Sequence, residues 1–524
     1  MKTLHLAAFA SLFVVLTLAA VLVGNGDIVV ALLPVLVAAA ACAVCLLPLR
    51  YALLTLMFLA LTMENPADVP AMGLWKSPLY PAGKVLLAHL NLTFPAQKWM
   101  AFSGLDVVLV VLSALALARW LGGSRVDRAT TPSARPMRTF ARVCLAGAMW
   151  MWVWGMARGG ADVASSLWQV QRVVYLPVVF LLFERSLRGP SDREALGKVV
   201  VAAACLKAVL AVYLHATLVP PAPLDHLDYA TIHADSMLFS GAFCIVAALL
   251  IQRVTRRRAL LAALVLPLLV AGMIANHRRV VWVELAAGLA TVTALSPWTR
   301  TKRTIARAAI IAAPFVALYG AAGWGSESGI FAPVQTVRSV IDSKADASTE
   351  WRDLENYDLF FTLRQAPLLG TGYGHGYVEN VKLPAISGVY KLYRFIPHNS
   401  ILSLCAYGGV VGFFALWSVP VVGIFLAARA SRHARRPVDR AAAIAACAMI
   451  VVYEVHCYGD MGLGTWTSVF TVGPALAAAA QLAVATGAWP RRAARAQEAP
   501  TIAVGVVPNA APGGERRLHA GGES

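Results

Sequence analysis

The sequence predicts an all-α, polytopic integral membrane protein, and three observations predict it. Hydrophobic residues make up 59% of the 524 residues and charged residues only 14%, with a mean hydropathy of +0.67. Soluble domains are about 45–50% apolar and about 25% charged. The apolar runs are long enough to cross a membrane as helices of about twenty residues. The alternating segments of about ten residues that a membrane β-barrel needs are absent from the sequence.

The hydropathy pattern predicts about 12–14 transmembrane helices. Two of the predicted segments, 50–63 and 172–184, are short for a bilayer. The number of helices is therefore about 14 if both cross the membrane and about 12 if neither does. The first segment also has features of a cleaved signal peptide, because Lys2 precedes an apolar run that ends in small residues. We place the spans at residues 5–23, 28–48, 50–63, 103–121, 143–157, 172–184, 196–215, 237–251, 259–275, 280–296, 305–322, 398–427, 441–455 and 465–487.

The positive residues behind the net charge of +18 are spaced as in a membrane protein that follows the positive-inside pattern, and not as in a nucleic-acid-binding surface. Arginines gather in short segments between spans, and every second connecting segment is basic, which is the positive-inside pattern. This pattern predicts that both termini are cytoplasmic, and we expect no nucleic-acid partner. The basic segments are 125–138, 185–193, 256–258, 300–303, 432–440 and 491–495.

The predicted topology divides the chain into four parts. Residues 1–322 form the N-terminal part of a transmembrane bundle, 323–397 a large outer loop, 398–489 the C-terminal transmembrane helices, and 490–524 a disordered basic cytoplasmic tail. Most polar residues lie on the outer side, away from ATP and nucleotide sugars. An enzyme acting there needs a donor that was activated before it crossed the membrane, and lipid-diphosphate-linked sugars meet that need.

A histidine lies at the start of the span 398–427, directly after the large outer loop. Asn399 offers an amide that can orient this imidazole or contact a substrate. Imidazoles in general can take a proton from an attacking hydroxyl or bind a phosphate oxygen. His398 is therefore a candidate catalytic residue and Asn399 a candidate substrate-binding residue. The alternative interpretation of His398 is a polar anchor at the membrane interface.

Two adjacent arginines, Arg278 and Arg279, interrupt the apolar stretches at the predicted outer end of the span 259–275, against the positive-inside trend. Charged groups at membrane depth cost several kcal/mol unless they are paired or face an aqueous cavity, so they are functional candidates. The planar guanidinium forms bidentate hydrogen bonds that suit a diphosphate. We choose Arg279 as the cavity-facing catalytic candidate and Arg278 as substrate-binding. The alternative is that both extend to lipid head groups, with Glu284 as a structural counter-ion.

The large outer loop contains a predicted helix at about 350–364, which includes Arg352, and then the glycine-rich run 370–376. Its alternate glycines resemble a phosphate cradle, so Gly372 and Gly374 are candidate substrate-binding residues. The run lacks the Lys-Ser/Thr and the preceding strand of a nucleotide-binding loop. We favour a tight turn that packs the loop against the bundle, with direct contact between these backbone amides and phosphate or sugar as the alternative.

The segment 225–235 carries two histidines and three aspartates, which would suffice for a metal ion by count alone. The spacing matches no defined metal site, so we predict no metal. Asp235, at the mouth of the span 237–251, is the member expected to line a cavity and contact substrate.

Three segments, in this order, resemble those of the bacterial O-antigen ligase and Wzy-type O-antigen polymerase superfamily. Together they cover about residues 270–415. They are the Arg278-Arg279 pair, then Trp351-Arg352 followed by Pro367-Leu368-Leu369-Gly370-Thr371-Gly372-Tyr373-Gly374, and finally Pro397-His398-Asn399-Ser400.

This resemblance implies a GT-C-like membrane enzyme whose donor is a glycan on undecaprenyl diphosphate at the periplasmic face of the bacterial inner membrane. It implies metal-independent transfer to an acceptor hydroxyl, without a cofactor. By the same resemblance, Arg279 and Arg352 clamp the diphosphate, and His398 orients or deprotonates the acceptor. The expected partners are the undecaprenyl-diphosphate-linked oligosaccharide, an acceptor glycan or lipid, membrane lipids and a chain-length regulator.

The resemblance leaves the acceptor open. We favour an O-antigen or exopolysaccharide polymerase, with an O-antigen ligase that transfers the glycan to lipid A–core or another acceptor as the alternative. A non-catalytic lipid-linked glycan flippase or transporter is an alternative of a different class. Transporters tend to have internal repeats and charges near the membrane midplane, and this sequence has neither feature in evident form.

Overall fold

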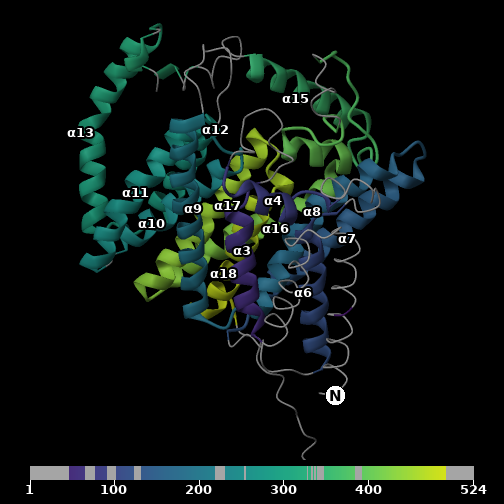
Figure 1. Ribbon diagram of the computed structural model, residues 1–524, viewed down its shortest axis with the longest axis horizontal. Coiled ribbons are helices and arrows are strands. Elements are labelled where there is room, and N and C mark those ends of the chain that lie inside the picture. Colours follow the sequence, from purple (N-terminus) through teal and green to yellow (C-terminus); the bar gives the residue numbers. More distant parts are fainter. Residues whose placement is uncertain are drawn as a thin grey trace, which may run out of the picture. The chain divides into compact units, whose positions relative to one another are not determined.

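The structure is a computed structural model that describes residue 14 and residues 47–64, 77–90, 102–122, 131–218, 230–252, 255–326, 328–331, 334–335, 338, 347–383 and 392–490 (Figure 1). The chain separates into Met1–Pro490 and Arg491–Ser524, and everything below concerns the first unit. Within the described ranges the fold is helical and has no β-strand beyond one isolated bridge. The helices are α3 Leu49–Thr62, α4 Tyr80–Leu86, α6 Gly104–Leu121, α7 Arg135–Ala157, α8 Val163–Ser186, α9 Pro190–Leu218, α10 Asp235–Ile251, α11 Arg256–Asn276, α12 Val280–Leu295, α13 Arg300–Gly323, α15 Ala347–Gln365, α16 Ser400–His433, α17 Pro437–Gly459 and α18 Trp466–Ala485, with short 3₁₀ turns at Gly329–Phe331 and Gly462–Gly464.

The predicted spans from 50–63 onward each fall on one of these helices. Nine described helices are long and apolar enough to cross a membrane, and α3, α10 and α12 are shorter apolar helices. The protein is therefore a multi-pass helical membrane protein. The predicted span 5–23 and nearly all of 28–48 lie outside the described residues, as does the tail from 491 onward.

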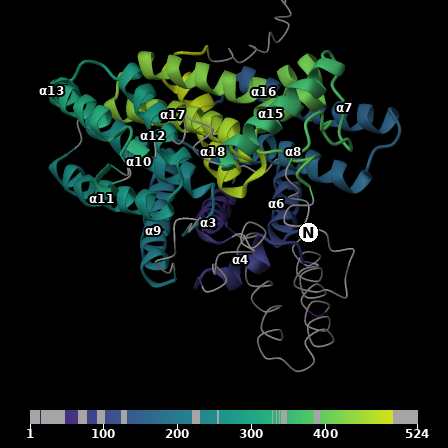
Figure 2. The ribbon, with the colours of Figure 1, turned by 90° about the horizontal axis from the view of Figure 1, so that it is seen from above.

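Helix α18 lies at the centre of the packing and α13 at its margin. The apolar window of α18 is 89% buried, whereas none of the α13 window is buried (Figure 1). The cause is local sequence, because α18 is rich in alanine, and small residues let membrane helices approach closely. A Cβ at Gly473 would lie 2.8 Å from Val179 of α8. Helix α16 runs beside α17, and both pack on α18 (Figure 2).

Helix α16 is broken near its start, and the glycine-rich loop fills the break. Gly409 has φ 56° and ψ −161° inside the helix. The amides that follow the break donate to the preceding loop, Val410 N to Pro367 O at 2.9 Å and Val411 N to Leu368 O at 3.1 Å. Broken helices at membrane depth require such internal partners. These contacts confirm that the loop turns tightly and packs against the bundle.

The glycines of this loop use their backbone amides within the protein. Gly372 N donates to Tyr407 O at 2.8 Å, and Gly374 N donates to the Gln169 side chain at 2.7 Å. Neither amide can donate to a phosphate without breaking one of these bonds. The substrate-binding role assigned to Gly372 and Gly374 stays a prediction, and packing alone accounts for both.

Gly372→Ala is expected to damage folding rather than substrate binding. Gly372 has a φ of 78°, and a Cβ there would lie 2.4 Å from the backbone of Gly155 in α7. Both the left-handed backbone and the collision disfavour any side chain, so we expect a loss of roughly 2–4 kcal/mol. Folded yield and melting temperature in detergent measure it. Gly320→Ala in α13, where a Cβ meets nothing within 4 Å, is the matched control. A Gly372→Ala protein that melts like the control would contradict the packing role.

Candidate functional site

His398 is held by a buried carboxylate of helix α15. Its backbone N–H donates to Glu355 Oε2 at 3.0 Å, and its Nδ1 lies 3.3 Å from the same oxygen and 3.4 Å from Oε1. The Glu355 side chain is only 1% exposed. The Trp351 ring meets the imidazole edge-on, with centroids 4.9 Å apart. A carboxylate that accepts from Nδ1–H leaves Nε2 as the proton-accepting nitrogen.

Asn399 positions the segment that carries His398. Its side-chain oxygen accepts from Leu402 N at 3.0 Å and so caps the start of α16, the usual role of asparagine at this position. Its side-chain NH₂ donates to Asn356 of α15 at 3.0 Å. Asn399 is buried, so the geometry gives it an orienting role, and its contact with substrate stays a prediction.

Asp460, which follows α17, is the buried anion of the site. Nδ1 of His233 lies against its carboxylate, and its backbone oxygen accepts from the Ser400 hydroxyl at 3.2 Å. Burial alone would raise the pKa of Asp460, but His233, Arg352 and His398 hold that pKa well below its usual range. Asp460 is therefore ionised at neutral pH, and Arg352 and His398 both lie within its electrostatic reach.

His233, which precedes α10, forms the second imidazole–carboxylate pair. Burial lowers its pKa, Asp460 opposes that shift, and the Arg278 and Arg352 cations add to it. The imidazole is therefore neutral at physiological pH and presents its Nδ1–H to Asp460. The arrangement matches that of His398 with Glu355.

The predicted arginines come together only in part. Arg352 acts electrostatically on both His233 and Asp460, and Arg278 acts on His233. Arg278 is buried, whereas Arg279 lies beside it, half-buried, directly before α12. The geometry therefore brings Arg278 to this cluster, and the choice of Arg279 as the cavity-facing arginine stays a prediction.

We use the name outer-end cluster, after the side on which the sequence analysis predicts it to lie, for five residues of this site: His233, Arg278, Arg352, His398 and Asp460. They come from segments far apart in the sequence, at the starts of α10, α12, α15 and α16 and the end of α17. Helix α15 packs directly on α16 (Figure 1). Beneath the cluster, Glu284 of α12 accepts from His456 of α17 at 2.7 Å, and both side chains are buried. This pair gives Glu284 a hydrogen-bonding partner within the protein.

Asp235 lies in a separate buried triad. Lys207 Nζ is 2.8 Å from Glu64 Oε1 and 2.9 Å from Asp235 Oδ2, and all three side chains are 0% exposed. The triad joins the end of α3, the middle of α9 and the start of α10. Asp235 thus has a partner within the protein, and its predicted contact with substrate is not needed to explain its position.

The outer-end cluster combines the fixed positive charge of two arginines with two imidazoles. The Arg278 and Arg352 guanidiniums can bind phosphate oxygens, and either imidazole can accept a proton. Among the residues that the structure describes, no group of three or more His, Cys, Asp or Glu side chains could hold a metal ion. Residues 225–229 of the histidine- and aspartate-rich segment lie outside the described ranges.

No protein-family model matches this chain, and no curated protein sequence matches it. The fold defines the class, a multi-pass helical membrane protein, and the site adds a partly buried ionic cluster at the end of the bundle where α10, α12 and α16 begin. The resemblance to the O-antigen ligase and polymerase superfamily stays a prediction.

Proposed function

We propose that this chain is a membrane glycosyltransferase that polymerises glycan repeat units carried on undecaprenyl diphosphate, at the periplasmic face of a bacterial inner membrane. The observation that carries the proposal is the outer-end cluster itself. Arg352, Arg278 and His398 were selected from separate segments of sequence. Arg278 and Arg352 both lower the pKa of His233, and Arg352 and His398 both lower the pKa of Asp460.

In the proposed reaction, an acceptor hydroxyl attacks the anomeric carbon of the donor glycan, and the bond from that carbon to the lipid diphosphate breaks. Arg352, with Arg278 and Arg279, binds the diphosphate and stabilises the charge that develops on it. His398 takes the proton of the hydroxyl on Nε2, since Glu355 lies against Nδ1. Atoms and charge balance, because the proton lost by the acceptor stays on the imidazole until solvent removes it.

The direct test is complementation of a strain that lacks the gene, at matched protein levels, with surface glycan separated on a gel. His398→Ala and Arg352→Ala are expected to leave single lipid-linked repeat units where wild type makes long chains. His433→Ala is the control, because His433 lies exposed at the other end of α16.

The other outcomes separate the alternatives. Long chains that stay on the lipid carrier would indicate a ligase. Normal long chains in both variants would overturn the proposal and favour a transporter. If His233→Ala lost the synthesis of long chains and His398→Ala retained it, His233 would be the base.

Asp460→Asn is expected to lower the turnover number by about 100-fold while KM for the lipid donor stays unchanged. The amide keeps the shape of the side chain but removes an anion that stabilises the positive charge His398 gains when it takes the proton, and the arginines that bind donor remain. An Asp ordinarily has a pKa of about 3.9. Because the pKa of Asp460 lies well below that value, its charge is lost only in strong acid.

The factor by which Asp460→Asn lowers the turnover number should therefore be constant between about pH 5 and pH 8. The stability that Asp460 contributes is likewise present above its ordinary pKa and lost as the pH falls through the lower, folded value. Initial rates in proteoliposomes measure both kinetic constants. Asp353→Asn, an exposed neighbour of Arg352, is the control. An increase in KM with unchanged turnover would place Asp460 in donor binding instead.

A further inference from the structure

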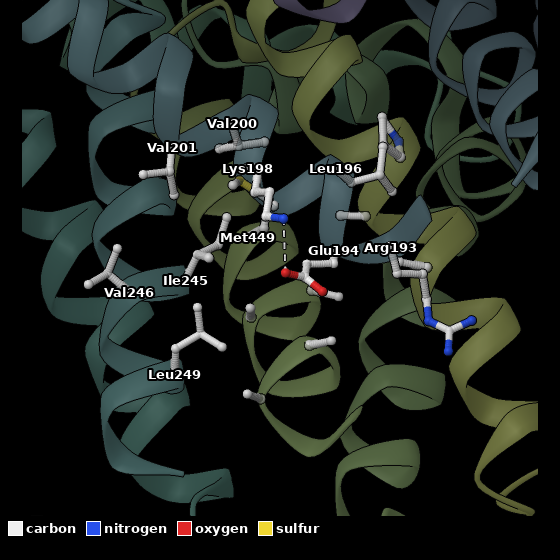
Figure 3. A pocket seen from close by; sticks show the side chains of 18 of the residues that line it. Arg193, Glu194, Leu196, Lys198, Val200, Val201, Ile245, Val246, Leu249 and Met449 are labelled. Carbon is white, nitrogen blue, oxygen red and sulfur yellow. Dashed lines mark ion pairs between the residues drawn. The ribbon is translucent and has the colours of Figure 1, made fainter. Parts of the chain in front are cut away.

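A cavity lies in the half of the bundle away from the outer-end cluster. Its volume is about 560 Å³, within the range of about 300–1,000 Å³ typical of ligand pockets. It lies between the first halves of α9, α11 and α17 and the second half of α10, with α18 at its back (Figure 3). Asp460 follows the last residue of α17, so the cavity and the cluster occupy opposite ends of that helix.

The cavity exists because small residues face large ones. Helix α17 contributes alanines, including Ala442 and Ala445, and α9 contributes Gly197. Across from them stand the larger apolar side chains of Ile245 and Leu249. The wall is therefore almost entirely apolar, and the hollow lies within membrane-crossing helices. A hydrocarbon chain fits such a wall better than any water-soluble group.

The mouth of the cavity carries charge. Arg193, in the first turn of α9, has a side chain only 5% exposed, with one guanidinium nitrogen 3.5 Å from Asp439 of α17. Its other terminal nitrogen is buried and has no hydrogen-bond acceptor among the residues that the structure describes. Lys198 and Glu194 pair at the same mouth, at 3.0 Å (Figure 3). A buried arginine donor without an acceptor is costly, and an incoming anion removes that cost.

We propose that this cavity binds an anionic phospholipid, with the phosphate at Arg193 and one acyl chain along α10 and α17. Basic pockets between transmembrane helices on the cytoplasmic side are suited to anionic head groups. The basic segments at the starts of α9 and α17 place this end in the cytoplasm under the positive-inside pattern. The lipid donor of the proposed reaction has its diphosphate at the other end, so it is not the expected occupant.

Native mass spectrometry of the purified full-length protein tests the proposal with two probes, phosphatidylglycerol and phosphatidylcholine of identical chains. Wild type is expected to hold one phosphatidylglycerol about tenfold more tightly than phosphatidylcholine. Arg193→Gln should remove that preference. Arg436→Gln, which removes an exposed arginine at the same end, is the matched control and should keep it.

A second variant tests the cavity without disturbing Arg193. A Cβ at Gly197 would have Ile245 as its nearest neighbour outside its own helix backbone, at 3.9 Å, so Gly197→Leu fills the hollow without a collision. We expect it to weaken binding of both lipids. Wild-type lipid binding by Gly197→Leu, or equal binding of the two lipids by wild type, would overturn the proposal. Displacement of phosphatidylglycerol by a lower concentration of a polyprenyl monophosphate would assign the cavity to that lipid instead, and would also overturn it.

Discussion

Arg352→Ala is expected to lower kcat/KM for glycan transfer by about 10²–10³-fold while leaving the protein folded. The side chain lies one helical turn before Glu355 on α15, and side chains three residues apart share a helix face. Glu355 holds His398, so this face presents the arginine and the imidazole to the same space. The Arg352 charge also contributes to the lowered pKa of Asp460.

The size of the effect follows from the chemistry proposed for the leaving group. A lipid diphosphate gains negative charge as its bond to the sugar breaks, and a fixed cation stabilises that charge most in a site that excludes water. Arg352→Lys keeps the charge but loses the planar, two-pronged donor geometry, so we expect only partial recovery. If Arg352→Ala lost transfer activity and Arg352→Lys kept all of it, Arg352 would act through its charge alone.

The measurement is the initial transfer rate in proteoliposomes with a purified lipid-linked donor, together with the melting temperature of each variant. Arg364→Ala is the matched control, because it removes an exposed arginine from the last turn of the same helix. If Arg352→Ala retained activity within a few-fold of Arg364→Ala, the outer-end cluster would not be the site of transfer.

The hydropathy pattern located the helices well and their ends poorly. The span predicted at 172–184 is the apolar half of α8, which begins at Val163. Its first turns look like loop sequence because they carry polar side chains. Those side chains are satisfied by tertiary contacts, as when Gln169 donates to Phe395 O at 2.9 Å and accepts from Gly374 N at 2.7 Å. Periodicity in one segment contains no information about a partner some 200 residues away.

In the site, too, some residues could be predicted from the sequence and others could not. His398 could be selected from its own segment, at the start of a span, and Arg352 through the family resemblance. Asp460 could not, since a single aspartate between two spans forms no pattern until α17 brings it to His233. Glu355 was hidden in an otherwise ordinary polar helix. Lys207 did leave a signal, namely a charged residue within the predicted span 196–215, which by itself indicates a buried partner.

Lys207→Met is expected to be the most destabilising single substitution considered, with a loss of about 3–5 kcal/mol. The lysine is the only cation of the buried triad, at 2.8 Å from Glu64 and 2.9 Å from Asp235. Methionine has a similar shape but leaves two carboxylates facing each other with no exposure to solvent. Folding must then either bury uncompensated negative charge or bind protons, and both cost free energy. Because the triad joins α3, α9 and α10, the loss should affect the whole bundle.

The melting temperature in detergent measures this loss, and two comparisons separate charge from packing. Lys198→Met changes an exposed lysine of the same helix, paired with Glu194 at 3.0 Å, and should cost no more than about 0.5 kcal/mol. The triple variant Glu64→Gln, Lys207→Met, Asp235→Asn removes all three charges and should recover most of the stability, because neutral side chains of similar volume replace a buried ionic group at little cost. A Lys207→Met protein as stable as Lys198→Met would contradict the structural role of the triad. If the triple variant folds and transfers glycan at the wild-type rate, Asp235 acts in packing; if it folds but has lost transfer, the prediction that Asp235 contacts substrate gains its support.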